Sequence, residues 1–226
     1  MNPKQAVAEY GAGLVRSGMV LGLGSGSTAT LMVQAIGEKL RAGTLRDVIG
    51  VPSSSAIAAV ATAAGVPLTT LDAHPVLDLD LDGADEVDPH LNLIKGLGGA
   101  LLWEKIVATA ARELVILVDD SKLVPILGSK APLPVEVVPF GWKAQRDFLS
   151  GLGGTPVLRT RPDGQPYVTD EGNYILDTRF AGIADPAALE RQLLLRAGVV
   201  ATGLFLGMAR QIVVGKAGGI EVLRRD

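Results

Sequence analysis

Short strand-like segments that end in polar turns and lead into helical patterns are the feature that most constrains the fold of this chain. Strands are expected at residues 19–23, 48–51, 67–71, 77–81 and 114–118. Helical spacing follows at residues 28–41, 56–64 and 100–112. Repeated strand–turn–helix units favour a mainly parallel sheet with right-handed crossovers. We therefore expect an α/β domain whose ligands bind beyond the carboxyl ends of the strands.

The pattern changes after Pro132. A strand is expected at residues 134–139, and antiparallel strands are expected at residues 156–161, 167–169 and 174–177, with Gly164 and Gly172 in their turns. Helices are expected at residues 142–149 and 186–196. This predicts a smaller α+β domain over residues 131–204, inserted into the parallel-sheet domain of residues 1–130 plus 205–226.

Composition excludes several classes of function. The net charge of −3 and the sequence pI of about 5.5 provide no basic footprint for nucleic acid or an anionic membrane surface. The absence of cysteine excludes disulfides and cysteine-ligated zinc, and neither His74 nor His90 has metal-ligand spacing, so no metal site is expected. The chain has no long uncharged apolar run and no signal-peptide pattern, so a cytoplasmic location without a membrane span is expected.

Two polar turns follow apolar strands. Residues 22–28, GLGSGST, fit the G-x-G-x-x-G spacing only in part, but they place free amides and hydroxyls at a helix start. Such a turn is either a phosphate cradle or a tight turn with a serine cap. The serine run at residues 53–55 could serve a sugar hydroxyl or phosphate, although helix capping is the simpler interpretation.

A dense run of charge begins at residue 78. Its six acidic members, all before Lys95, are Asp78, Asp80, Asp82, Asp85, Glu86 and Asp88. Residues 77–82 alternate leucine with aspartate, which gives a strand one acidic and one apolar face. A strand between two helix layers should be almost continuously apolar, so this strand is expected at a sheet edge or with its acidic face in a cleft.

Lys95 is followed by a glycine-rich turn, residues 96–99, and by a helix start that carries Glu104. Glycines let the backbone come close to a ligand, and a lysine can stabilise a developing oxyanion. Taken alone, Glu104 would be a surface glutamate that pairs with Lys95 or Lys105. Lys122 closes another strand end, where it could meet phosphate or be an ordinary surface charge.

Taken together, these motifs resemble ribose-5-phosphate isomerase of the A type. The matching pieces are GLGSGSTA at 22–29, DGADEVD at 82–88, KGLGGAL at 95–101 with EK at 104–105, VDDSK at 118–122 and IVVGKAGGIEVL at 212–223. They occur in the family's order and roughly its spacing, and they cover nearly the whole chain. The ordered set is more specific than any single motif.

The resemblance implies interconversion of D-ribose 5-phosphate and D-ribulose 5-phosphate through an enediol or enediolate, in the non-oxidative branch of the pentose phosphate pathway. It implies a Rossmann-like domain with a ferredoxin-like α+β lid and oligomerisation domain, and a homodimer or dimer of dimers. It also implies a phosphosugar as the small-molecule partner, with no metal or organic cofactor.

The same resemblance implies roles for individual residues. Glu104 is the base that moves a proton between C2 and C1, Asp82 helps to open the furanose ring, and Asp85 and Lys95 complete the catalytic set. Because a proton alpha to a carbonyl is weakly acidic, the base must be matched by stabilisation of the enediolate oxygen. The residues expected to bind substrate are Ser25, Gly26, Ser27, Thr28, Asp82, Gly83, Ala84, Asp85, Lys95, Gly96, Leu97, Gly98 and Lys122.

Leu97 interrupts the glycine run that the family usually carries after the lysine. A leucine would be strained at this position if its φ were positive. Two other classes of protein remain open: a non-catalytic sugar-phosphate sensor, and a related α/β enzyme such as a sugar-phosphate deaminase or a CoA transferase. The carboxylates of Glu104, Asp82 and Asp85 favour catalysis, and deaminase chemistry would be expected to use a histidine.

Overall fold

The computed structural model describes residues 2–225, which form two compact units. Of these residues, the first unit comprises 2–84, 103–122 and 207–225, and the second comprises 85–102 and 123–206. The chain therefore first passes between the units after Ala84, inside the turn that the sequence singled out, and returns after Leu102.

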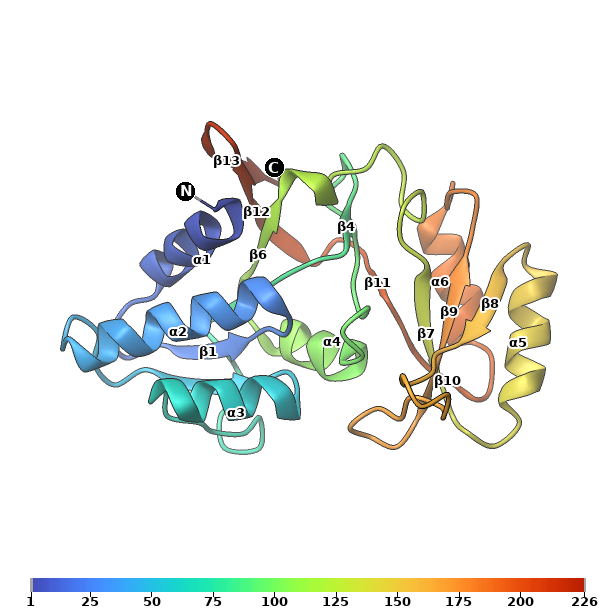
Figure 1. Cartoon of the computed structure of the whole chain (residues 1–226), viewed down its shortest axis with the longest axis horizontal. Helices are drawn as coiled ribbons and strands as arrows, with labels where there is room; N and C mark the ends of the chain where they lie inside the picture. The colour runs from blue at the N-terminus through green and yellow to red at the C-terminus, as the bar shows by residue number, and fades with distance from the viewer. Residues whose placement is uncertain (1, 226) are drawn as a thin grey trace. The chain divides into compact units, whose positions relative to one another are not determined.

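A six-stranded sheet forms the centre of the first unit (Figure 1). In spatial order its strands are β13 (Gly219–Arg224), β12 (Ala209–Lys216), β6 (Leu114–Asp119), β3 (Leu79–Asp82), β1 (Val20–Leu23) and β2 (Ile49–Pro52). The strands from β12 to β2 pair in parallel, and β13 is added antiparallel to β12. The expected α/β class with a mainly parallel sheet is confirmed.

Helices cover both faces of this sheet, as its buried strands require. The helices of the first core are α1 (Pro3–Leu14), α2 (Ser27–Arg41) and α3 (Ser55–Ala64). Leu21 and Leu23 of β1 pack with them, as does Leu81 of β3. On the opposite face, Val107 of α4 (Leu101–Ala110) packs with Val51 and Leu77.

Strand β3 lies inside the sheet, between β6 and β1, so the alternative of an edge strand is wrong. All four of its residues are buried, including Asp80 and Asp82. The neighbouring strand makes room for them, because a Cβ on Gly22 would lie 2.5 Å from Asp80 Oδ1 and 2.6 Å from Val107 Cγ1. The acidic face of β3 is therefore the face covered by α4.

The second unit contains two antiparallel sheets. The strands of the larger are, in spatial order, β10 (Val199–Thr202), β7 (Leu133–Val137), β9 (Tyr174–Arg179) and β8 (Thr155–Leu158). The smaller has the order β11 (Leu204–Phe205), β5 (Leu93–Ile94) and β4 (Glu86–Val87). Helices α5 (Trp142–Gly151) and α6 (Pro186–Leu194) contribute Leu149 and Leu193 to the unit's main core.

Two expected strands are not formed. Residues 67–71 make a single bridge, from Leu68 to Gly50, and residues 167–169 lie in an irregular loop next to a bridge between Thr160 and Pro166. Pro67 begins the first segment and Pro166 directly precedes the second, and each lacks a backbone donor that a ladder would need.

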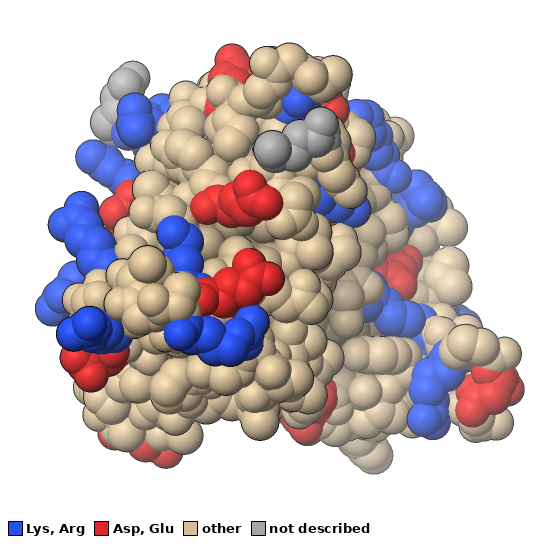
Figure 2. Space-filling view, turned by 60° about the vertical axis from the view of Figure 1, so that its left-hand side comes forward, with Lys and Arg blue, Asp and Glu red and all other residues tan. Residues whose placement is uncertain are grey.

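The face in Figure 2 carries basic and acidic side chains close together. Interspersed charges of both signs do not create the single-sign field that steers association with nucleic acid. Within residues 2–225, none of the helices combines the length and the apolar character needed to cross a membrane.

Candidate active site

The Asp82 carboxylate organises the polar turns of the first unit. Its Oδ1 accepts the N–H of Ser25 at 3.0 Å and the N–H of Gly83 at 2.7 Å, so it ties the end of β1 to the end of β3. A Cβ on Gly24 would overlap Cα, Cγ and Oδ1 of Asp82, and glycine is therefore required there. Asp82 is 1% exposed, and Gly83 and Ala84 beside it are half-buried.

Two serines orient the Ser25 hydroxyl. Its Oγ lies 2.9 Å from Ser53 Oγ and 2.7 Å from Ser54 Oγ, and both partners are buried. Ser54 also caps α3, because its Oγ accepts the N–H of Ile57 at 3.1 Å. The serine run thus caps a helix, as the simpler interpretation predicted, and also fixes a candidate substrate-binding hydroxyl.

The N-terminus of α2 presents the rest of the GLGSGST turn. Gly26 precedes the helix with φ 101°, a conformation that favours glycine, and its Cβ position is open. Ser27 is exposed, Thr28 is half-buried, and Lys4 Nζ donates to Ser27 Oγ at 3.2 Å. Free backbone N–H groups beside a lysine are suited to an anion. The contact of Lys4 with this turn could not be predicted from sequence spacing alone.

Lys122 lies in a short 3-10 helix, Asp120–Lys122, at the end of β6. Burial raises the pKa of Asp119, but hydrogen bonds from Ser121 and the positive charges of Lys122 and Lys4 outweigh burial and lower that pKa overall. Asp119 therefore stays ionised. The positive charges of Lys122 and Lys4 therefore both act on the Asp119 carboxylate at this strand end.

Glu104 occupies the first turn of α4 and is 3% exposed. Val107, one turn further along the helix, packs toward Gly22 of β1, so Glu104 lies on the helix face that is turned toward the sheet. Asp80, on the sheet face covered by α4, is 0% exposed. The interpretation of Glu104 as a surface glutamate is therefore wrong, because this side chain belongs to the interior.

In the second unit, Asp85 holds the glycine-rich turn. Its Oδ2 accepts the N–H of Leu97 at 3.0 Å, and its own N–H donates to the carbonyl of Ile94 at 2.8 Å. Gly96 and Gly99 have positive φ angles, 100° and 89°, whereas Leu97 does not. Leu97 is 40% exposed. It is unstrained at this point, because the flanking glycines adopt the left-handed conformations.

Lys95 is almost completely buried, with 2% exposure. Its backbone N–H donates to the carbonyl of Gly203 at 2.9 Å, which joins the start of the loop to the chain between β10 and β11. Its Nζ lies 5.4 Å from the centroid of the Phe205 ring, within cation–π range. The ammonium is thereby held over an aromatic face rather than left on the surface.

Other acids of the same run have structural roles. The Glu86 carboxylate accepts the backbone N–H groups of Gly128, Lys130 and Ala131 at 2.5 to 2.6 Å. The Asp88 carboxylate accepts N–H groups of His90 and Asn92 and so shapes the β4–β5 turn. In the first unit, Asp78 accepts the N–H of Val20 and pairs with Arg112 at 2.6 Å.

The described residues contain no group of three or more His, Asp or Glu side chains that could hold a metal ion. His74 Nδ1 lies 2.8 Å from Thr69 Oγ1, and His90 is exposed in the β4–β5 turn. Both histidines therefore lie outside regular elements, as expected.

Each unit brings part of the predicted set together. In the first unit, Ser25 and Gly83 bond to Asp82, and Ser27 bonds to Lys4. The members in the second unit are Asp85, Lys95, Gly96, Leu97 and Gly98, and Asp85 is bonded to Leu97. Sequence reasoning missed Arg159, which bonds to the same loop, because it lies 62 positions beyond Leu97 and in no recognisable motif.

Known proteins provide an independent comparison. The family model described as ribose 5-phosphate isomerase A (phosphoriboisomerase A) matches residues 49–219. Ribose-5-phosphate isomerase A of Chloroflexus aurantiacus is 52% identical over 218 residues, which cover 96% of this chain and 91% of that protein.

Two solved structures also resemble the chain. One is a D-ribose-5-phosphate isomerase in complex with phospho-erythronic acid, with a TM-score of 0.97, 39% identity and full coverage of both chains. The other is ribose 5-phosphate isomerase A from Methanocaldococcus jannaschii, with a TM-score of 0.94, 40% identity and 99% coverage of both chains. Given the family-model match and relatives at about half identity over nearly its whole length, this chain belongs to the ribose-5-phosphate isomerase A family.

Proposed function

We propose that this chain interconverts D-ribose 5-phosphate and D-ribulose 5-phosphate through an enediolate. The observation that carries the proposal is the buried Glu104 carboxylate, present in a chain that belongs to this isomerase family along its length. A protein that only senses a phosphosugar needs to bind it, but it has no use for a buried base. A solved relative holds phospho-erythronic acid, which is itself a phosphorylated sugar acid.

In the proposed reaction, Asp82 first assists opening of the furanose ring. Glu104 then takes the proton from C2, and the electron pair of that C–H bond forms the C1–C2 double bond of the enediolate. As this bond forms, the π electron pair of the C1 carbonyl moves onto O1. A proton then passes from the C2 hydroxyl to O1, and the protonated Glu104 returns its proton to C1 as the C2 carbonyl forms, which gives the ketose. A positioned carboxylate in this role contributes about 10²- to 10⁴-fold to the rate.

Stabilisation of negative charge is assigned to lysine side chains and to backbone amides. The Lys95 ammonium and the loop amides serve the enediolate oxygen, and Asp85 helps to position the reacting hydroxyls. The phosphate is assigned to residues 25–28 at the start of α2 and to Lys122. Fixed donors of this kind act without reorganisation during the reaction, which is where their catalytic advantage arises.

Ketose formation from ribose 5-phosphate, measured with purified protein in the presence of EDTA, tests the proposal. Glu104→Gln keeps the shape of the side chain but removes the base, so kcat should fall by about 10²- to 10⁴-fold while substrate still binds. Glu113→Gln is the matched control, since Glu113 is an exposed glutamate next to β6, and it should keep wild-type kcat. No turnover by the wild type would exclude the isomerase, and full activity of Glu104→Gln would remove Glu104 as the base.

We also propose that the enzyme is homodimeric and cytoplasmic, and that residues 131–204 form its lid and oligomerisation domain. These proposals rest on the family resemblance. Light scattering coupled to size-exclusion chromatography measures the molar mass directly. A mass of one 23.4 kDa chain at micromolar concentration would contradict the dimer.

A further inference from the structure

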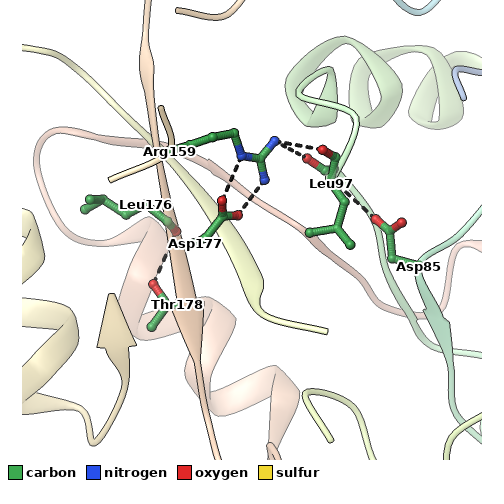
Figure 3. A network of polar contacts seen from close by, with 7 residues as sticks. Asp85, Leu97, Arg159, Leu176, Asp177 and Thr178 are labelled. Atoms are coloured by element: carbon green, nitrogen blue, oxygen red, sulfur yellow. Dashed lines mark hydrogen bonds and ion pairs between the residues drawn. The ribbon is translucent and has the colours of Figure 1, made fainter. Parts of the chain in front are cut away.

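Arg159 connects a strand end of the second unit to the loop that follows Lys95. Its Nε donates to Asp177 Oδ2 at 2.8 Å and its Nη2 contacts Oδ1 at 2.5 Å, a two-pronged pairing with β9. Its Nη1 donates to the carbonyls of Gly96 and Leu97, both at 3.0 Å. Figure 3 shows this guanidinium between Asp177 on one side and the loop backbone on the other.

Held carbonyls fix the direction of the amides that follow them. In a planar trans peptide the C=O and the next N–H point in opposite directions. Because the carbonyls of Gly96 and Leu97 face Arg159, the N–H groups of Leu97 and Gly98 face away from it. The Leu97 N–H reaches Asp85 Oδ2, as Figure 3 shows.

The second of these amides is available to a ligand. Within residues 2–225, the N–H of Gly98 has no hydrogen-bond partner. Gly98 is exposed, and a Cβ built on it would meet no atom within 4 Å. An oriented N–H with open space beside it is the kind of donor that stabilises an oxyanion.

Further contacts of Arg159 and its neighbour Tyr167 support the same loop. The Arg159 guanidinium carbon lies 5.8 Å from the centroid of the Tyr167 ring, and the Arg159 side chain is only 12% exposed. Tyr167 fills the place where a Cβ of Gly99 would be, 2.5 Å from Tyr167 Cζ. The turn over residues 96–99 is therefore held at both ends.

We propose that Arg159 is a positioning residue of the isomerase: by holding the Gly96 and Leu97 carbonyls, it aims the Leu97 amide at Asp85 and the Gly98 amide at the substrate's developing enediolate oxygen. This inference rests on the proposed function. Lysine cannot replace arginine here, because an ammonium is a point charge without the planar fork that reaches a carboxylate and two carbonyls at once.

Arg159→Lys is the informative variant, since it keeps a positive charge opposite Asp177 and so avoids an unpaired carboxylate. We expect kcat to fall by about 10- to 100-fold, as for a misplacement of roughly 1 Å, with KM within about threefold of wild type. Arg161→Lys, at an exposed arginine two residues further along the chain, should change neither kcat nor KM. Unchanged kcat in Arg159→Lys, or a rise in KM alone, would overturn the proposal that Arg159 positions an amide for the enediolate oxygen.

Amide hydrogen exchange provides a readout that needs no turnover. In the wild type the Leu97 amide is bonded to Asp85 and should exchange slowly; in Arg159→Ala it should exchange faster, and added guanidinium should restore both protection and kcat. Equal Leu97 exchange in wild type and variant would refute the clamp. An inactive wild type that still shows this difference would count against the isomerase proposal and leave the clamp standing.

Discussion

Gly24→Ala is the sharpest test of how the strand ends are built. The added methyl group would overlap Cα, Cγ and Oδ1 of Asp82, and because one of these is a backbone atom, rotating the side chain cannot relieve the clash. The new Cβ would lie roughly 1 Å closer to these atoms than ordinary van der Waals contact allows. Asp82 must then move, and its hydrogen bonds to Ser25 and Gly83 lengthen or break.

The magnitude follows from these contacts. Overpacking of about 1–3 kcal/mol, together with weakening of a charge-assisted hydrogen bond, should lower the free energy of unfolding by about 2–4 kcal/mol. If Asp82 takes part in catalysis, a displacement of roughly 1 Å should also lower kcat by about 100-fold. Thermal unfolding measures the first effect, and ketose formation from ribose 5-phosphate measures the second.

Two other glycines separate stability from catalysis. In Gly11→Ala the new Cβ would lie 2.6 Å from Leu117 Cδ1, the end of a core side chain, so stability should fall by about 1–2 kcal/mol with kcat unchanged. In Gly13→Ala, on the exposed side of α1, nothing lies within 4 Å, and stability should rise by about 0.5–1 kcal/mol. Wild-type kcat in Gly24→Ala, or a loss equal to that in Gly11→Ala, would refute the reasoning.

Two further predictions concern the second unit. Burial raises the pKa of Glu136 against the hydrogen bonds from Asn173 and Thr169, so its contribution to stability is present at low pH and is lost as pH rises above the ordinary carboxyl value of 4.5 toward the raised pKa. Glu136→Gln should therefore raise Tm at pH 8 relative to wild type and flatten the dependence of Tm on pH; an unchanged pH profile would contradict this. Leu97→Ala should leave the free energy of unfolding within about 0.5 kcal/mol of wild type, because Leu97 is exposed and lacks a positive φ, and a larger loss in a denaturant titration would show hidden packing.

Much of the fold was predictable, because local pattern and tertiary environment agree over most of the first unit. Apolar runs with polar ends became β1, β2 and β6, and the glycine and serine turns became helix starts. The prediction failed where one proline broke a ladder, as at residues 67–71, and where strands are only two residues long, as in β4 and β5. Segments that short carry no periodicity to read.

For the candidate site, the sequence singled out residues but could not tell their roles apart. The acidic run drew attention to Asp82 and Asp85, yet Glu86 is as buried as Asp82 and serves the backbone of residues 128–131 instead. The sequence shows the same residue types, Asp and Glu, whether a carboxylate is structural or catalytic. Only its partners distinguish a structural acid from one available for chemistry.

By itself, the sequence determined the α/β class and the family, because periodicity and the ordered motifs are local properties of the chain. The tertiary structure alone decided that the Asp80 strand lies inside the sheet, that Leu97 is unstrained, and that Arg159 reaches the loop after Lys95. The first and the last of these depend on a neighbour that is distant in sequence: Gly22 beside Asp80, and Asp177 beside Arg159. Space and direction at a site come from such neighbours, and sequence spacing does not encode them.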